Sequence, residues 1–352
     1  MSWRRLAATV LVSLTTVLSL VGMSNVVQAS PQATYGAPKE GTKITLADTS
    51  IDGPAITTTY GSATALAWTG TDAAHHLNVM TSSDGLHYSS KHILPELSLW
   101  RPALAFIDSG RGAPYGTLML AWTGTDARHT LNVEFIKLPD FTVTQKITYW
   151  GEWSFTAPAL ATVNGDINSD VFLSWAGTDS AHTVNVMHIK SVQLTHTKTI
   201  LWGWHSISRP NLSRDLASDA AGPVILSWTG VDNRIAFAHL SADMTKWTMP
   251  GASPLSQQSA WAPSMNAAYS TTAPTHWLAW TGSGTTSDHR LNVRYTQQYP
   301  SWSGANTQTT LDETAISSPA WAFTGNGQSG QALLAWAGTD RYHHLNIAVI
   351  SV

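Results

Sequence analysis

One seven-residue motif recurs along this 352-residue chain, and its repetition limits the folds that the chain can adopt. The motif reads Leu-Ala-Trp-Thr-Gly-Thr-Asp in its first copy, residues 66–72, and later copies differ at a few positions. Its central tryptophans are Trp68, Trp122, Trp175, Trp228, Trp280 and Trp336. They are spaced by about 53 residues, a period typical of folds built from repeated structural units.

Each repeat contains four short runs with the alternating pattern of β-strands. The first run follows a proline such as Pro54, which suits the first residue of a strand because proline lacks an N–H group. The second run contains the tryptophan, and the third reads Leu-Asn-Val in several copies. The fourth often carries a lysine, such as Lys91, which protects an exposed sheet edge. Six such repeats predict an all-β six-bladed β-propeller of four-stranded antiparallel blades.

The two ends of the repeat region predict how the ring closes. The sixth repeat stops after its third strand, whereas residues 43–54 read as an unattached fourth strand followed by the next proline. This segment matches residues 308–319 almost step for step. We therefore expect the N-terminal strand to complete the last blade, so that residues 42–352 form a single propeller domain.

Residues 1–29 have the pattern of a secretion signal peptide. Arg4 and Arg5 supply the positive start, an apolar stretch follows, and small residues around Ala29 offer a cleavage point. Residues 30–41 lack periodicity and indicate a flexible leader. We expect a secreted, extracellular protein without membrane contact beyond the signal segment, and an uncleaved anchor is the alternative.

Composition bears on several classes of function. The chain has no cysteine, which excludes disulfides and cysteine-bound metals. Its net charge is −3 and no basic cluster lies beyond the first residues, so we expect no nucleic-acid partner. A phosphate-binding loop and a zinc-binding helix motif are missing from the sequence. We expect no cofactor, no metal and a monomeric protein.

Two turns resemble those of a known superfamily. Residues 82–88 and 241–247 resemble, in degenerate form, the Asp-box turn Ser-x-Asp-x-Gly-x-Thr-Trp of the sialidase-like, or BNR-repeat, β-propellers. The resemblance implies six blades and a structural turn between the third and fourth strands. For sialidases it also implies an arginine triad, a Tyr–Glu nucleophile pair and an acid/base Asp. No Tyr–Glu pair recurs at matching strand ends here, so we assign no catalytic residue and leave enzymatic activity open.

The hairpin between the second and third strands carries an Asp-x-x-His pattern in four repeats. The pairs are Asp72/His75, Asp126/His129, Asp179/His182 and Asp340/His343. The fifth repeat keeps His289, and the fourth keeps Asp232 but has Ile235 in place of histidine. A carboxylate and an imidazole together can bind sugar hydroxyls. Alternatively, the Asp caps its own turn and the His stacks beside it. One Asp and one His per blade are too few ligands for a hard metal ion.

Tryptophans also precede several first strands, on the face that these hairpins share. We single out Trp100, Trp153, Trp204 and Trp261, together with Arg101 and Arg209. An aromatic ring can bind the apolar side of a sugar. The alternative is that these rings pack between blades as additional core.

These features together predict a secreted carbohydrate- or cell-surface-binding propeller, lectin-like, with repeated shallow sites between blades. Its partners would be glycans or a surface polysaccharide, and several weak sites on one ring would add avidity. Two alternatives remain open. One is a sialidase-like glycoside hydrolase with a single central site, and the other is a protein-interaction scaffold.

Overall fold

The computed structural model describes most of the chain from residue 37 onward. The described ranges are 37–111, 115–163, 169–190, 195–215, 223–251, 253–269, 274–283, 289–297, 299, 301–302, 308–324 and 331–351. The predicted signal, residues 1–29, lies outside these ranges, as do residues 30–36 of the predicted leader. All described residues belong to one compact unit, Tyr35–Val352.

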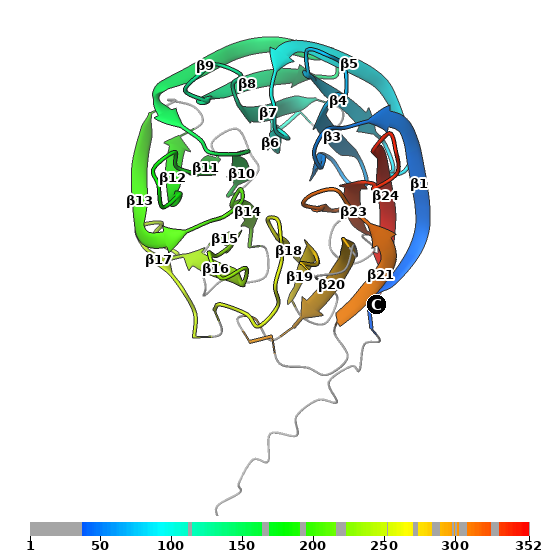
Figure 1. Cartoon of the computed structure of the whole chain (residues 1–352). Coiled ribbons are helices and arrows are strands. Elements are labelled where there is room, and N and C mark those ends of the chain that lie inside the picture. The colour runs from blue at the N-terminus through cyan, green and yellow to red at the C-terminus, as the bar shows by residue number, and fades with distance from the viewer. Residues whose placement is uncertain are drawn as a thin grey trace, which may run out of the picture. The chain divides into compact units, whose positions relative to one another are not determined.

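Six four-stranded antiparallel sheets stand around a common axis as the blades of a propeller (Figure 1). Blade 1 contains β2 (Ala55–Thr58), β3 (Thr64–Thr69), β4 (His76–Ser82) and β5 (Tyr88–Leu97). Blade 2 contains β6 (Ala103–Asp108), β7 (Gly116–Thr123), β8 (Thr130–Leu138) and β9 (Thr142–Trp153). Blade 3 contains β10 (Ala159–Thr162), β11 (Asp170–Ala176), β12 (Thr183–Lys190) and β13 (His196–His205).

The remaining blades follow the same order from the axis to the rim. Blade 4 contains β14 (Asn211–Arg214), β15 (Val224–Thr229), β16 (Ile235–Leu240) and β17 (Trp247–Thr248). Blade 5 contains β18 (Ser264–Tyr269), β19 (Pro274–Thr281), β20 (Arg290–Thr296) and β21 (Gln308–Thr314). Blade 6 contains β22 (Ala320–Phe323), β23 (Ala332–Ala337), β24 (His344–Ser351) and β1 (Lys39–Thr49).

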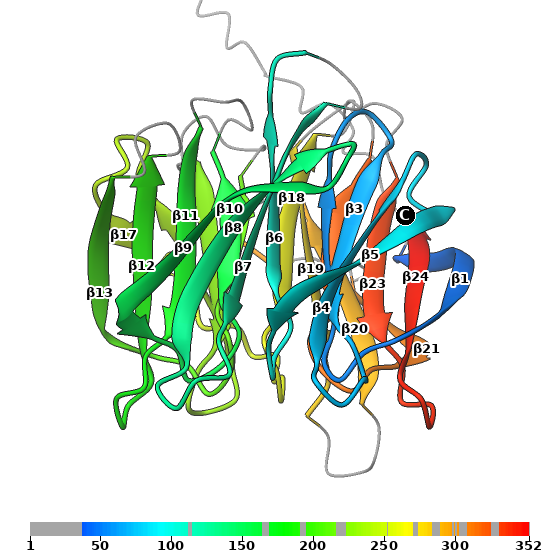
Figure 2. The ribbon, with the colours of Figure 1, turned by 90° about the horizontal axis from the view of Figure 1, so that it is seen from above.

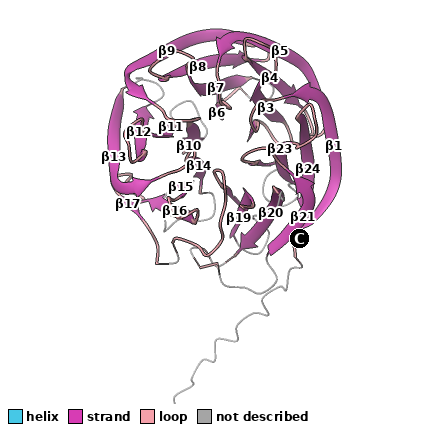
Figure 3. Ribbon diagram, in the orientation of Figure 1, coloured by secondary structure: helices cyan, strands magenta, loops and turns pink. Residues whose placement is uncertain are grey.

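The predicted all-β six-bladed propeller, with its last blade closed by the N-terminal strand, is confirmed. β1 pairs antiparallel with β24, with Ile44 opposite Ile347, and Figure 2 shows the two strands side by side. β1 begins at Lys39, which pairs with Ser351. Residues 39–41, which the sequence assigned to the leader, therefore extend the sheet. The described residues form strands and loops (Figure 3), and none of them belongs to a helix able to cross a membrane.

The tryptophans of the repeated motif form the centre of the core. All six are at most 3% exposed, and each belongs to an apolar cluster shared between its own blade and the preceding one. A buried Trp removes 150–250 Å² from water, so each contributes roughly 4–6 kcal/mol before the loss of entropy is subtracted. The repeat therefore holds neighbouring blades together through one indole per junction.

The lysines of the outer strands do more than protect an edge. Lys91 lies over the ring of Trp68, with Nζ 5.8 Å from the ring centroid, and its Nζ binds Asp48 of the preceding blade at 2.7 Å. The same arrangement recurs for Lys43 with Trp336 and Glu313, Lys146 with Trp122 and Glu96, and Lys198 with Trp175 and Glu152. Each lysine thus covers the tryptophan of its own blade and ties that blade to the one before it.

Candidate functional site

The carboxylates of the Asp-x-x-His turns are hydrogen-bonded within their own turns. Asp72 accepts hydrogen bonds from the backbone N–H groups of Ala74 at 3.1 Å and His76 at 3.2 Å. Its Oδ1 also lies 2.7 Å from Nδ1 of His76. Asp126, Asp179 and Asp340 make equivalent backbone contacts. The structure therefore places the four predicted Asp residues as turn caps.

These hydrogen bonds also affect the acidity of the carboxylates. Burial raises the pKa of Asp72, but hydrogen bonds from the side chain and backbone of His76 and from the backbone of Ala74 outweigh it and hold the pKa below its ordinary value. The pKa of Asp126, Asp179 and Asp340 is lowered against burial in the same way. The four side chains therefore stay ionised above their lowered pKa values, with lone pairs engaged by the backbone.

The histidines of these turns adopt an unusual backbone conformation. His75, His129, His182 and His343 have φ angles of 60°, 57°, 49° and 57°, in the left-handed region that side-chain-bearing residues seldom occupy. Nδ1 of His75 lies 3.3 Å from the carbonyl oxygen of Gly70, and His182 and His343 make the same contact. Because a carbonyl oxygen only accepts, Nδ1 is the donor in these three contacts, which leaves Nε2 outside the turn's own hydrogen bonds.

Aromatic rings lie against turn histidines at three junctions between blades. Trp100 meets His129 edge to face, with ring centroids 5.0 Å apart, and Trp261 meets His289 at 4.7 Å. At the junction of blades 2 and 3, Phe155 stacks on His182 at 3.7 Å and is 40% exposed. Sequence reasoning missed Phe155 because it followed tryptophans only. The shared Ser-apolar-x-x-Pro spacing of the links, as at residues 154–158, could have found it.

The other two predicted tryptophans differ in their surroundings. Trp153 is 36% exposed, and the guanidinium of Arg128 lies over its ring at 5.3 Å. Trp204 instead stacks on Trp228 of the next blade, with ring centroids 5.0 Å apart, and packs against the core shared by blades 3 and 4. Trp153 is open to a ligand, whereas Trp204 lies mostly within the packing between blades.

The two predicted arginines lie away from these junctions, beside the axis. Arg101 is 3% exposed and Arg209 is 6% exposed. Arg101 donates from its guanidinium to the carbonyl oxygens of Pro54 and Ser318, which belong to the segments leading into blades 1 and 6. Gly53 is needed where this side chain passes, because a Cβ there would lie 3.1 Å from Nη1 of Arg101 and 2.3 Å from the Ser318 oxygen.

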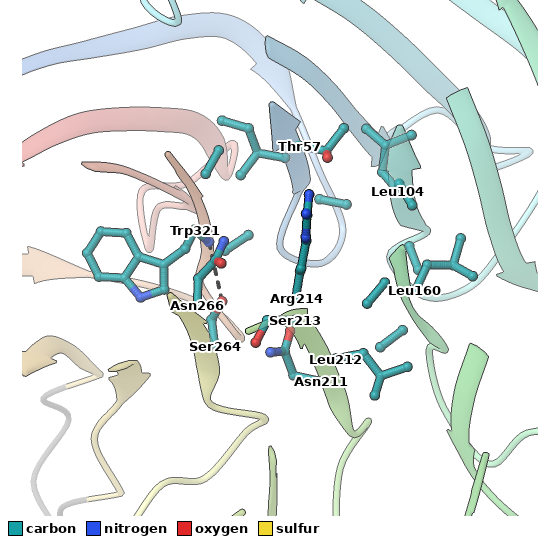
Figure 4. A pocket seen from close by; sticks show the side chains of 18 of the residues that line it. Thr57, Leu104, Leu160, Asn211, Leu212, Ser213, Arg214, Ser264, Asn266 and Trp321 are labelled. Atoms are coloured by element: carbon teal, nitrogen blue, oxygen red, sulfur yellow. Dashed lines mark hydrogen bonds between the residues drawn. The ribbon is translucent and has the colours of Figure 1, made fainter. Parts of the chain in front are cut away.

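A cavity of about 410 Å³ follows the propeller axis and is lined by the first strands of all six blades (Figure 4). Polar side chains in its wall include Asn211, Ser213 and Asn266, and Figure 4 shows Arg214 extending into it. The charged residues among its described lining are Arg101, Arg209, Arg214 and Asp108. The described residues contain no cluster of three or more possible metal ligands.

The Asp-box-like turn at residues 82–88 lies between β4 and β5, on the opposite side of the blade from the Asp-x-x-His turn. Ser82 Oγ accepts from the N–H of Gly85 at 2.9 Å, and Asp84 accepts from the N–H of Leu86 at 2.9 Å. Hydrogen bonds from His87, first its backbone and then its side chain, hold the pKa of Asp84 well below its ordinary value. The second turn, residues 241–247, forms the corresponding Ser–Asp contacts. Both turns are structural.

No family model matches the sequence, and no curated protein is similar to it. Solved structures are similar in fold. A lectin of Aleuria aurantia, described as a six-bladed β-propeller with a novel fucose recognition mode, is 11% identical with a TM-score of 0.62, covering 88% of this chain and 97% of its own. A protein of unknown function from Dyadobacter fermentans is 10% identical with a TM-score of 0.59, covering 90% of this chain and 99% of its own.

A third similar structure is a subtype N11 neuraminidase-like protein of a flat-faced bat isolate from Peru. It is 9% identical with a TM-score of 0.53, and the match covers 90% of this chain and 94% of that chain. At such identities the similarity concerns the backbone architecture and carries no information on individual side chains. The chain is therefore a six-bladed β-propeller, an architecture that it shares with a fungal lectin and a neuraminidase-like protein.

Proposed function

We propose that the protein is a secreted, lectin-like propeller that binds glycans at shallow sites between its blades. The observation that carries this proposal is the repeated contact of a partly exposed aromatic ring with a turn histidine at a blade junction, where His129 and His182 have the left-handed backbone conformation. The three pairs, Trp100/His129, Phe155/His182 and Trp261/His289, lie at equivalent junctions of one face. Trp153 with Arg128 adds a further open ring on that face.

Blade 4 shows that the fold itself does not require the imidazoles. Its turn places Asn233, with a φ of 62°, at the left-handed position, so the sequence-based match of Ile235 to that position was wrong. The carbonyl of Asn233 accepts from the N–H of Ser259 at 2.9 Å, as that of His129 does from Ser154 at 3.0 Å. Asparagine tolerates this conformation better than most residues. Histidine shares this tolerance, so the turn accepts either residue and the fold does not depend on the imidazole.

The chemistry of each junction suits a sugar. An aromatic face binds the apolar side of a pyranose ring, and neighbouring polar groups bind its hydroxyls. At the junction of blades 2 and 3, Nδ1 of His182 donates to the carbonyl of Gly177, which leaves Nε2 for a sugar hydroxyl, whereas Nδ1 of His129 is buried without a hydrogen-bond partner among the described residues. The Asp residues hold the turn that presents the histidine, so we assign sugar contact to the rings and a positioning role to the carboxylates.

Similar folds give this proposal a first ligand to test. The Aleuria aurantia lectin is described by its fucose recognition, and another structure of it contains α-methyl-L-fucoside. Fucosylated glycans are therefore the first class to screen. The alternative of a sialidase-like hydrolase with a central site gains no support from the axial cavity, because that chemistry uses a Tyr–Glu pair and an acid/base Asp, and the described lining contributes Asp108 but neither a tyrosine nor a glutamate.

A glycan array tests the proposal directly. We expect wild-type protein to bind a defined set of glycans, and Trp100→Ala with Trp261→Ala to lower that signal at least about ten-fold through loss of two stacking platforms. Trp202→Ala is the matched control, because Trp202 is 78% exposed on β13 and lies outside the three pairs. Absence of any glycan binding by wild type, or equal signals from all variants, would exclude junction sites.

A further inference from the structure

Two buried cations face the axial cavity at the end where the first strands begin. Arg101 and Arg209 each precede the proline of a first strand, in blades 2 and 4, and both line the cavity. At 3% and 6% exposure they are removed from bulk water. Guanidinium groups remain charged in proteins, so both positive charges must be balanced within this part of the molecule.

The nearby protein groups satisfy these arginines only in part. Arg101 uses its two terminal nitrogens on the carbonyl oxygens of Pro54, Ser318 and Pro319. Arg209 donates from Nη1 to its neighbour's carbonyl, at a long 3.4 Å from the oxygen of Pro210. Nε of Arg101 and Nε of Arg209 are buried without a hydrogen-bond partner among the described residues. A buried donor of this kind normally costs free energy unless a ligand or water satisfies it.

The charges around this end of the cavity do not balance. Burial and then the neighbouring charge of Arg209 hold the pKa of Arg101 well below its ordinary value, and Asp52 opposes this. Burial lowers the pKa of Arg209 to about 10. Asp52 is itself engaged by the backbone N–H groups of Gly53 at 2.6 Å and Arg101 at 3.0 Å. Among the described residues, one carboxylate, already hydrogen-bonded to backbone, thus faces two guanidinium groups.

We infer that a small anion, either chloride or a simple carboxylate, binds at this end of the axial cavity between Arg101 and Arg209. The anion accepts from the two Nε–H groups and supplies the missing negative charge. Formate and chloride are small enough to enter a cavity of about 410 Å³. The site is separate from the blade junctions, so the inference does not depend on glycan binding.

Chloride NMR on the wild-type protein tests the inference without any substitution. We expect the ³⁵Cl line to broaden on adding protein and to narrow again when sodium formate competes at constant ionic strength. The concentration of formate that halves the broadening then compares the two kinds of anion. A line width that protein does not change, or that formate and a bulky sulfonate change equally, would overturn the inference.

A matched pair of variants locates the site. Thermal unfolding of wild type should shift upward by about 3 °C in saturating chloride or formate, relative to a bulky sulfonate at equal ionic strength. Arg209→Gln should abolish that anion-specific shift. Arg234→Gln should keep it, because Arg234 is exposed on the turn of blade 4. Retention of the full shift by Arg209→Gln would overturn the assignment, and if this variant does not fold, the chloride line width of wild type decides.

Discussion

At four junctions of the ring, a lysine and an acid form an ion pair beside the motif tryptophan. The two junctions that flank blade 4 have other residues at these positions. Around blades 5, 6, 1, 2 and 3, a lysine covers the motif tryptophan and pairs with an acid of the preceding blade. Between blades 3 and 4, Trp204 takes the position of the acid and stacks on Trp228. Between blades 4 and 5, Gln257 donates to Gln308 at 3.3 Å.

Blade 4 also departs from the pattern in its backbone. Its outer strand β17 has two residues, and its rim is continued by isolated contacts such as the Leu255 N–H to the carbonyl of Ile235 at 2.8 Å. Its turn keeps the left-handed residue as Asn233 without a histidine. The comparison shows which features the ring needs at every junction. The buried tryptophan is kept in all six blades and an Asp-capped turn in the five blades whose turn the structure describes, whereas the lysine, the acid and the imidazole can be exchanged.

The largest effect is expected at the feature that both regions share. Trp122→Ala in a charged junction and Trp228→Ala beside blade 4 should each lower the free energy of unfolding by about 3–5 kcal/mol, because both leave a cavity between two blades. Urea unfolding followed by far-UV circular dichroism gives these values. If Trp228→Ala cost far less than Trp122→Ala, the junction at blade 4 would not depend on its indole.

A glycine after each motif tryptophan gives the next comparison. A Cβ at Gly177 would lie 2.5 Å from Oδ2 of Asp179, whereas one at Gly230 would lie 3.1 Å from Oδ1 of Asp232. Gly177→Ala should therefore destabilise the protein by about 1–3 kcal/mol through overpacking. Gly230→Ala in blade 4 should cost clearly less. If urea unfolding gave equal losses of unfolding free energy for the two variants, the turn of blade 4 would have no more space for a side chain than the others.

The capping carboxylates predict a pH dependence of the regular blades. Asp179 has a lowered pKa in the folded protein, because hydrogen bonds from Thr183 and Ala181 outweigh burial. A group with a depressed folded pKa contributes stability above its unfolded pKa and loses it as the pH falls through the folded value. We expect the free energy of unfolding to drop below about pH 4, and Asp179→Asn to reduce this slope. A slope unchanged by the substitution would contradict the capping role.

Repetition explains which parts of the molecule the sequence could predict. Strand order, ring closure and the structural alternative for Asp72 follow from residues that recur, because a position needed by every blade recurs in every blade. The burial of Arg101 could not be predicted, since it depends on Gly53 and on Ser318, which lies 217 residues away. The same holds for Trp204, whose ring stacks on Trp228 of the next repeat. Among the described residues, no lysine covers Trp228.

The smallest effect is expected when the lysine–acid pair is introduced at the junction of blades 4 and 5, which has two glutamines in its place. This substitution is also the sharpest test of the comparison. Gln257 and Gln308 occupy the positions that Glu96 and Lys146 hold between blades 1 and 2. Gln257→Glu with Gln308→Lys should place the new lysine over Trp280 and raise the free energy of unfolding by about 0.5–1 kcal/mol. The reverse pair, Glu96→Gln with Lys146→Gln, should lower the free energy of unfolding by a similar amount.

Salt separates the two contributions to this effect. Because both groups are partly exposed, 1 M salt should remove the ion-pair share of each effect and leave the cation–π share. A double variant no more stable than its two single variants would show that the acid and lysine of this ring act through packing alone.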